Sequence, residues 1–166
     1  MNKNLIPQES IQNKIIILRG KKVMLDRDLA MLYGVPTKVF NQGVKRNIQR
    51  FPEDFMFQLT KEEAKSLRSQ IVTLQENQHF KYMPYAFTEH GILMLSSVLK
   101  SERAIQVNIQ IMRTFTKMRE MLLGYQELRD KIAIMEKKYD KQFKIVFDAL
   151  HQLLTPPEEP KEKIGF

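Results

Sequence analysis

The chain has 166 residues, a hydrophobic fraction of 43% and a formal net charge of +8. This length suits one compact domain with an appendage, or two small units. The absence of cysteine excludes disulfides and thiolate metal sites and fits a reducing compartment, so we expect a cytoplasmic protein. No apolar run of about 18 residues exists, so the sequence predicts no membrane span.

The positive charge is concentrated in one stretch of the chain. Residues 19–50 hold eight Lys or Arg and two Asp or Glu, whereas residues 101–166 hold 12 and 10. A local excess of this kind indicates a polyanionic partner at that place more strongly than the net charge alone.

The first part of the chain predicts a loose terminus and then a hairpin. Residues 1–13 are polar, and we expect them to be flexible. Two short β-branched or apolar runs, 15–18 and 23–25, flank a basic segment with Gly20. This pattern is typical of two short strands joined by a tight turn.

The stretch from Leu25 to Arg50 predicts two short helices. Asp26 is a suitable N-cap for a helix over Arg27–Tyr33, and Gly34 is a suitable left-handed stop. Pro36 is tolerated in a first helical turn, so a second helix is expected from there to about Arg50.

Shorter elements are expected between this pair and residue 100. Residues 55–59 alternate as a strand, and Thr60 with Glu63 forms a capping box for a helix to about Ser69. The runs 71–74 and 80–83 flank a polar loop and predict a hairpin. The aromatic residues Tyr82, Tyr85 and Phe87 are expected to pack in the core or in this hairpin rather than to stack on bases. Thr88 is a suitable cap for a helix to about Leu99.

From residue 101 the pattern changes to long helices. A first apolar face runs from Ala104 to Leu122, Gly124 interrupts it, and a second heptad-like series runs from Leu128 to Leu153. One apolar seam of this type is normally buried by a partner helix, so residues 102–154 predict a coiled coil or helical hairpin and a homodimer. Residues 156–166 form a polar tail.

The second helix of the pair has the composition of a DNA-recognition helix. On a wheel of about 100° per residue, Phe40, Val44 and Ile48 share one face and the polar residues share the opposite face. No carboxylate occurs from residue 35 to 52, which disfavours an ordinary solvated helix. Amide side chains suit adenine edges, and Lys and Arg suit phosphates or guanine. The predicted DNA-binding residues are Thr37, Lys38, Asn41, Gln42, Lys45, Arg46 and Arg50. Asn47 is expected to make a structural hydrogen bond.

Three segments carry a resemblance to a known family. They are KVMLDRDLAMLYGVPTKVFNQGVKRNIQRFPEDFMFQLTKEE, LRSQIV and YMPYAFTEHGILMLSSVLKSERAIQVNIQIMR, within residues 10–115. The chain resembles the ORF-six N-terminal, phage antirepressor-type domain of the KilA-N superfamily. The resemblance implies a small α+β DNA-binding domain of phage regulators that meets DNA through 37–42 and 44–47. The loop over 75–81 departs from the family pattern because its fixed charges are only Glu76 and Lys81.

The sequence gives little support for a metal site or for a catalytic pair of carboxylates. His79, His90 and His151 lack metal-ligand spacing, and the paired carboxylates Asp26/Asp28 and Glu53/Asp54 suit capping and turn roles. We therefore expect no metal, no cofactor, no small-molecule substrate and no catalysis.

The sequence predicts an α+β fold, with a small helix-turn-helix-containing domain of short strands followed by long C-terminal helices that are coiled-coil-like. The expected divisions are a flexible N-terminus (1–13), the DNA-binding domain (14–100), a helical oligomerisation region (101–155) and a polar tail (156–166). The predicted function is sequence-specific binding of double-stranded DNA by a phage- or prophage-derived transcriptional regulator. The alternative is a protein-interaction module whose N-terminal domain is a scaffold, and a nuclease ranks last.

Overall fold

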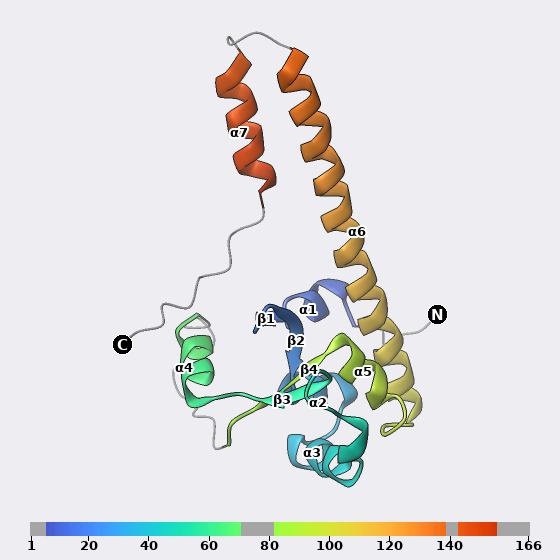
Figure 1. Ribbon diagram of the computed structural model, residues 1–166. Coiled ribbons are helices and arrows are strands. Elements are labelled where there is room, and N and C mark those ends of the chain that lie inside the picture. The colour runs from blue at the N-terminus through green and yellow to red at the C-terminus, as the bar shows by residue number, and fades with distance from the viewer. Residues whose placement is uncertain (1–5, 71–81, 139–142, 156–166) are drawn as a thin grey trace. The chain divides into compact units, whose positions relative to one another are not determined.

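The computed structural model describes residues 6–70, 82–138 and 143–155 (Figure 1). The chain divides into two compact units, one up to Phe115 and one from Thr116 onward. The first unit combines a four-stranded antiparallel sheet with helices, and the second is helical, which confirms the predicted α+β class with long C-terminal helices. No helix within the described ranges is both long and apolar enough to cross a membrane.

The sheet has the strand order β1-β2-β4-β3. Its strands are β1 (Ile16–Leu18), β2 (Lys21–Leu25), β3 (Met56–Gln58) and β4 (Tyr85–Thr88). The predicted hairpin of β1 and β2 is confirmed, with Leu18 opposite Lys21. Arg19 and Gly20 both have positive φ, at 53° and 72°. Two such residues make the type of two-residue turn whose twist matches that of the strands.

Strand β4 was not expected from the sequence and lies at the centre of the sheet, between β2 and β3. Phe87 is fully buried, whereas Tyr82 is 77% exposed, so the expected packing of the aromatic segment is right for Phe87 and wrong for Tyr82. The predicted hairpin lies mostly outside the described residues.

The described residues of the N-terminal unit form five α-helices and the start of a sixth. They are α1 (Gln8–Gln12), α2 (Asp26–Tyr33), α3 (Thr37–Arg46), α4 (Lys61–Gln70), α5 (Glu89–Leu95) and α6 (Glu102–Lys138), with a short 3-10 helix η1 (Ile48–Arg50). The expectation of a loose N-terminus is wrong for residues 8–12, because Ile11 is fully buried in the core.

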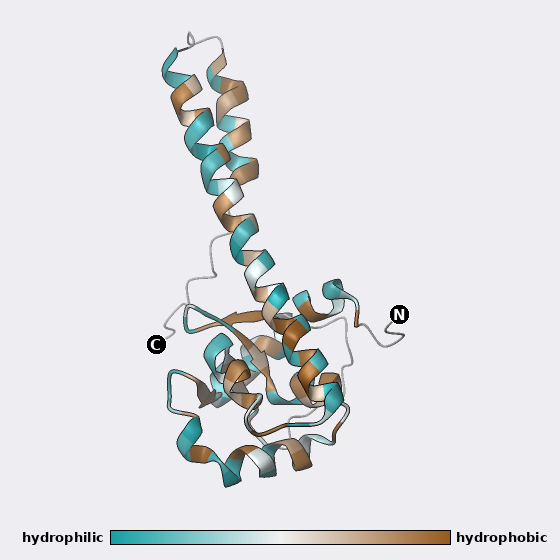
Figure 2. Ribbon diagram, turned by 90° about the vertical axis from the view of Figure 1, so that its right-hand side faces the viewer, coloured by the Kyte–Doolittle hydropathy of each residue, from teal (hydrophilic) through white to brown (hydrophobic). Residues whose placement is uncertain are grey.

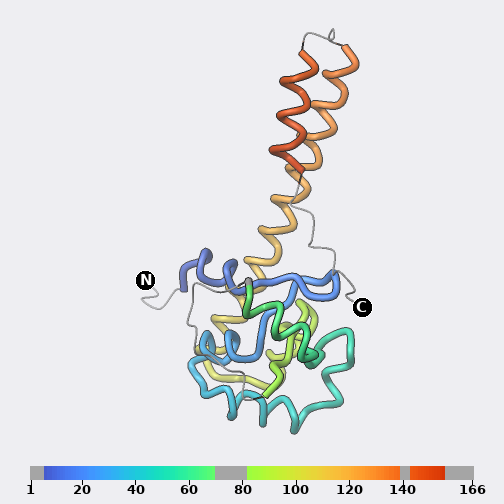
Figure 3. The backbone as a smooth tube through the Cα atoms, turned by 90° about the vertical axis from the view of Figure 1, so that its left-hand side faces the viewer, coloured from blue at the N-terminus to red at the C-terminus, as the bar shows by residue number. Residues whose placement is uncertain are grey.

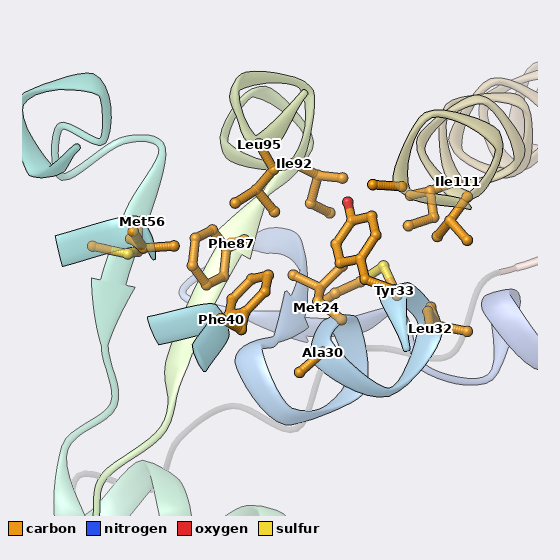
Figure 4. Close-up of a cluster of buried hydrophobic side chains, with 14 of the residues drawn as sticks. Met24, Ala30, Leu32, Tyr33, Phe40, Met56, Phe87, Ile92, Leu95 and Ile111 are labelled. Carbon is orange, nitrogen blue, oxygen red and sulfur yellow. The ribbon is translucent and has the colours of Figure 1, made fainter. Parts of the chain in front are cut away.

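Alternate residues of the strands direct side chains to two hydrophobic clusters. Met24 and Phe87 belong to the larger cluster, which also includes residues of α2, α3, α5 and the start of α6 (Figure 4). Val23 and Ala86 belong to a smaller cluster with α4. This alternation is the period of two expected when both faces of a sheet are covered.

Helix ends in the N-terminal unit follow the predicted capping chemistry in part. The Thr60 amide donates to Glu63 at 3.0 Å and the Glu63 amide donates to the Thr60 hydroxyl at 3.2 Å, which confirms the capping box. The Gly91 amide donates to the Thr88 hydroxyl at 3.3 Å, which confirms that cap. Helix α5 nevertheless ends at Leu95 rather than Leu99.

Helix α6 is longer than predicted. It continues through Gly124 to Lys138, so the expected interruption at Gly124 is wrong. One glycine costs a helix interior only about 1 kcal/mol, and the neighbouring Leu, Met, Gln and Glu residues are good helix formers. Residues up to Phe115 on α6 belong to the core of the N-terminal unit, which therefore extends past residue 100.

The second unit consists of the rest of α6 and helix α7 (Lys144–Leu154). Within it, Ile132 and Phe147 are buried, and His151 Nε2 lies 2.9 Å from the Glu136 carboxylate. These two helices are therefore in contact as a helical hairpin, which agrees with one of the two predicted arrangements.

Candidate nucleic-acid interface

Helix α3 is held in place by its buried face. Phe40 is fully buried, with its ring stacked on Tyr33 at 6.0 Å and edge-on to Phe87 at 5.5 Å, while Val44 is 3% exposed (Figure 4). These contacts join α3 to α2 and to the central strand. The opposite face therefore has a fixed orientation.

The turn before α3 is defined by Gly34. Its φ of 73° is the left-handed conformation that glycine adopts without strain. The Gly34 amide donates to Met31 O at 3.1 Å and the Val35 amide donates to Ala30 O at 3.0 Å. This pair of bonds is the Schellman arrangement, so the predicted helix stop is confirmed.

Asp26 links α2 to α3. It is 4% exposed, and one carboxylate oxygen accepts from the Arg27 amide at 2.8 Å while the other accepts from Asn41 Nδ2 at 3.0 Å. The structure differs from the prediction in that Asp26 is the first helical residue and Leu25 is the N-cap. The Asp26 carboxylate still accepts a hydrogen bond from an amide at the N-terminus of α2, and it also holds the side chain of Asn41 in place.

Helix α6 contacts the C-terminal end of α2. Arg103 Nε donates to Leu32 O at 3.2 Å, close to the turn at Gly34. The Tyr33 hydroxyl donates to Asn108 Oδ1 in the core, and burial raises the pKa of Tyr33 above its usual range. The start of α6 therefore supports the end of α2 and, through it, the position of α3.

The exposed face of α3 is strongly polar and basic. Lys38, Gln42, Lys45 and Arg46 are exposed, and Gln42 lies near the centre of their arc on the helix wheel. Among the described residues, no side chain forms an ion pair or hydrogen bond with any of the four. Helix α3 lies at the edge of the N-terminal unit, well away from β1 (Figures 1 and 3). This surface is open to a ligand.

A protein-family model for the ORF6N domain matches residues 13–98, which is more than half of the chain. The chain belongs to the ORF6N domain family. This finding confirms the predicted resemblance, and the family is associated with phages. The wider KilA-N grouping stays a prediction. No curated protein and no solved structure matches the chain.

Six of the seven predicted DNA-binding residues are exposed in the ORF6N domain. Thr37, Lys38, Gln42, Lys45, Arg46 and Arg50 are all exposed, on α3 or on η1 just after it. Asn41 is only partly exposed because its amide is bonded to Asp26. The sequence pattern identified this residue as polar but gave no sign of its buried carboxylate partner.

The end of α3 departs from the prediction. The helix stops at Arg46, where the Asn47 side chain donates to Gly43 O at 2.9 Å, as the expected structural hydrogen bond. Such a side-chain bond competes with continued helix. The chain then turns into η1, which leaves Ile48 53% exposed rather than on the buried face as predicted.

The described residues give no comparable support for a metal site. The described part of the chain contains no cluster of three metal-ligating side chains. His90 instead stacks on Phe55 with ring centres 5.6 Å apart. The 75–81 loop, in which Lys81 is the only fixed positive charge, lies outside the described residues.

Proposed function

We propose that this ORF6N protein binds double-stranded DNA by placing the exposed face of α3 in the major groove. The observation that carries the proposal is the carboxylate-free face of Lys38, Gln42, Lys45 and Arg46 on a helix anchored by Phe40. A major groove admits a single α-helix, and cations on that helix neutralise phosphates.

The side chains are assigned to three roles, which are base reading, phosphate contact and positioning. Gln42 is central and exposed, so it is assigned as the reader of a base edge, where an amide can bond adenine in a bidentate manner. Lys45, Arg46 and Arg50 are assigned to phosphates, and Thr37 and Lys38 to the bases or phosphates nearest the helix start. Asn41 is assigned a positioning role, because its Nδ2 already donates to Asp26.

The biological role that fits this activity is transcriptional regulation. A phage-associated family and a helical surface for DNA support a phage- or prophage-derived regulator. The proposal includes no catalytic step, cofactor or small-molecule substrate.

Salt dependence tests the phosphate contacts. The affinity of the full chain for a duplex selected from random DNA should fall steeply as salt rises, with a log–log slope of about −0.9 per phosphate neutralised. Lys45→Ala should make that slope shallower by about 1. Lys144→Ala removes the same charge from α7 and should leave the slope unchanged. A slope that is near zero in the unmodified protein contradicts the proposal.

Sequence discrimination tests the base reader. Gln42→Ala should weaken binding to the selected duplex by about 1–3 kcal/mol and have little effect on unrelated DNA. Lys45→Ala should weaken binding to both duplexes alike. If Gln42→Ala weakened both equally, Gln42 would be a backbone contact and the reader would lie elsewhere.

We also propose that the protein acts as a homodimer through the helical region. Met121, Leu128 and Met135 are spaced by seven residues and are 43%, 45% and 46% exposed. Apolar residues that repeat every seven positions form a seam along the helix. Such a seam is typical of helices that supercoil around one another and bury it between them. Helix α7 has 11 residues and leaves this seam exposed, so the seam needs a helix of comparable length.

A second copy of the chain supplies such a helix. The described residues of the helical unit carry seven Lys or Arg and five Asp or Glu, interspersed along both helices. A surface that carries both positive and negative side chains can be electrostatically complementary to a copy of itself. It attracts a strongly charged partner only weakly. A two-fold dimer would present two α3 helices to adjacent half-sites.

Point variants of the full chain test this association. Leu128→Glu should convert the dimer to a monomer in mass measurements by light scattering, because it places a charge in the seam. Leu123→Glu is the matched control, since Leu123 is 61% exposed and lies about 140° around the helix from Leu128. A monomer at all concentrations in the unmodified protein overturns the dimer. Binding of a different protein at this seam would then favour the alternative of an interaction module.

A further inference from the structure

Val39 is an unexplained apolar residue on the proposed recognition surface. Its side chain is 52% exposed in the first turn of α3, whereas the next residue, Phe40, is fully buried. Valine is a weaker helix former than Lys, Gln or Glu. Neither helix propensity nor solubility therefore favours valine at this position.

The position of Val39 relative to the polar side chains is informative. It precedes Gln42 by three residues and Arg46 by seven, so it lies about 60° around the helix from Gln42 and about 20° from Arg46. A base pair next to the one that Gln42 meets is therefore within the reach of Val39. The first turn of a recognition helix is also the part that most often contacts bases.

Only one group on the major-groove edges of the four base pairs is apolar, namely the C5-methyl group of thymine. We propose that Val39 reads a thymine by packing its side chain against this methyl group, beside the base contacted by Gln42. This inference rests on the proposed DNA-binding function and adds a second specificity element to it. Burial of the methyl group against the valine removes apolar surface of both from water.

Deoxyuridine tests this contact, because it differs from thymidine only by lacking that methyl group. In a duplex selected by the full chain, each thymine is replaced in turn by uracil. At one position the replacement should weaken binding about fourfold. This factor corresponds to a loss of about 0.8 kcal/mol, the free energy of burying one methyl or methylene group.

The Val39→Ala variant completes a double-mutant cycle with that substitution. It should bind the thymine duplex about as weakly as the unmodified protein binds the uracil duplex, and it should no longer distinguish the two. Ile17→Ala is the matched control, because Ile17 is also 52% exposed but lies on the edge strand β1. This control should retain the fourfold preference.

The outcomes separate the two proposals. If no thymine position is sensitive to uracil, or if Val39→Ala keeps the full preference, the methyl contact is wrong while DNA binding by α3 stands. If the full chain selects no duplex, the proposed function itself fails. Circular dichroism of Val39→Ala should match the unmodified protein, because the side chain contributes little to the core.

Discussion

The two units of the molecule differ in how far their apolar side chains are buried. In the N-terminal unit, most large apolar residues of β2, β4, α2 and α5 are buried, although Met31 and Leu93 are 56% and 54% exposed. Hydrophobic residues recur along both helices of the helical unit (Figure 2). Among them, Ile145 and Leu153 are 82% and 80% exposed, and Leu123 is 61% exposed. The first unit therefore has a large buried core, whereas the described residues of the second unit bury only Ile132 and Phe147.

The transition occurs along α6 itself. Ile111 and Phe115 are buried in the N-terminal core, whereas Met121 and Leu122 are 43% and 45% exposed. Helix α7 is apolar on more than one side, since Phe147 is buried while Val146 is 55% exposed. A helix that is hydrophobic all round is normally buried. The contrast is consistent with the proposed homodimer, in which a second copy would cover part of the exposed apolar surface of the helical unit.

The largest expected effect concerns folding of the N-terminal unit. Phe40→Ala should lower its free energy of unfolding by about 3–5 kcal/mol, because it removes a fully buried ring between Tyr33 and Phe87. Ile145→Ala removes an apolar group of the helical unit and should change this value by less than about 0.5 kcal/mol. Hydrogen exchange of the β2 and β4 amides measures both. Similar losses for the two variants would contradict the division into units.

Effects of intermediate size are expected from replacing one glycine in each unit. A Cβ built on Gly91 would lie 2.1 Å from the backbone oxygen of Phe55, whereas one on Gly124 meets nothing within 4 Å. Gly91→Ala should therefore destabilise the N-terminal unit by about 1–3 kcal/mol, as overpacking does. Gly124→Ala should instead stabilise α6 by up to about 1 kcal/mol. Thermal unfolding followed by circular dichroism compares them, and a tolerated Gly91→Ala would contradict the close approach of α5 to Phe55.

Local signals in the sequence predicted much of this fold correctly. The turn at Gly20, the capping box at Thr60 and Glu63, and the helix stop at Gly34 each depend on neighbouring residues alone. Strand β4 depends on pairing with β2 and β3, which are distant in sequence, so four residues after a proline gave too little pattern to identify it. Helix α6 was predicted as two pieces because the cost of one glycine was overestimated against a long run of helix formers.

The candidate site was predictable in composition but not in detail. The wheel placed Lys38, Gln42 and Lys45 on one face, and the structure leaves all three exposed. The link from Asn41 to Asp26 joins residues 15 positions apart on different helices, and no periodicity reveals such a partner. On the same wheel Val39 lies about 100° from Phe40, outside the apolar face, and the structure leaves it 52% exposed.

The smallest expected effect is a pH-dependent change in the unfolding free energy of the N-terminal unit. Arg19 Nη2 lies 2.8 Å from Glu63 Oε1, and the hydrogen bonds from Arg19 hold the pKa of Glu63 below its usual value. A carboxyl group whose pKa is lower in the folded state adds stability above its unfolded pKa of about 4.3. That stability is lost as the pH falls through the lower, folded pKa.

Arg19→Gln should therefore lower the unfolding free energy at pH 7 by about 0.2–1 kcal/mol, the range for an exposed ion pair. The difference from the unmodified protein should shrink below about pH 4, as Glu63 becomes protonated in both. Arg19→Lys keeps the positive charge and should retain part of the effect. Urea unfolding of the N-terminal unit at pH 7 and pH 3 measures the change. An equal loss at both pH values would mean that Arg19 acts through its position over the Phe57 ring, 4.1 Å from the ring centre, rather than through Glu63.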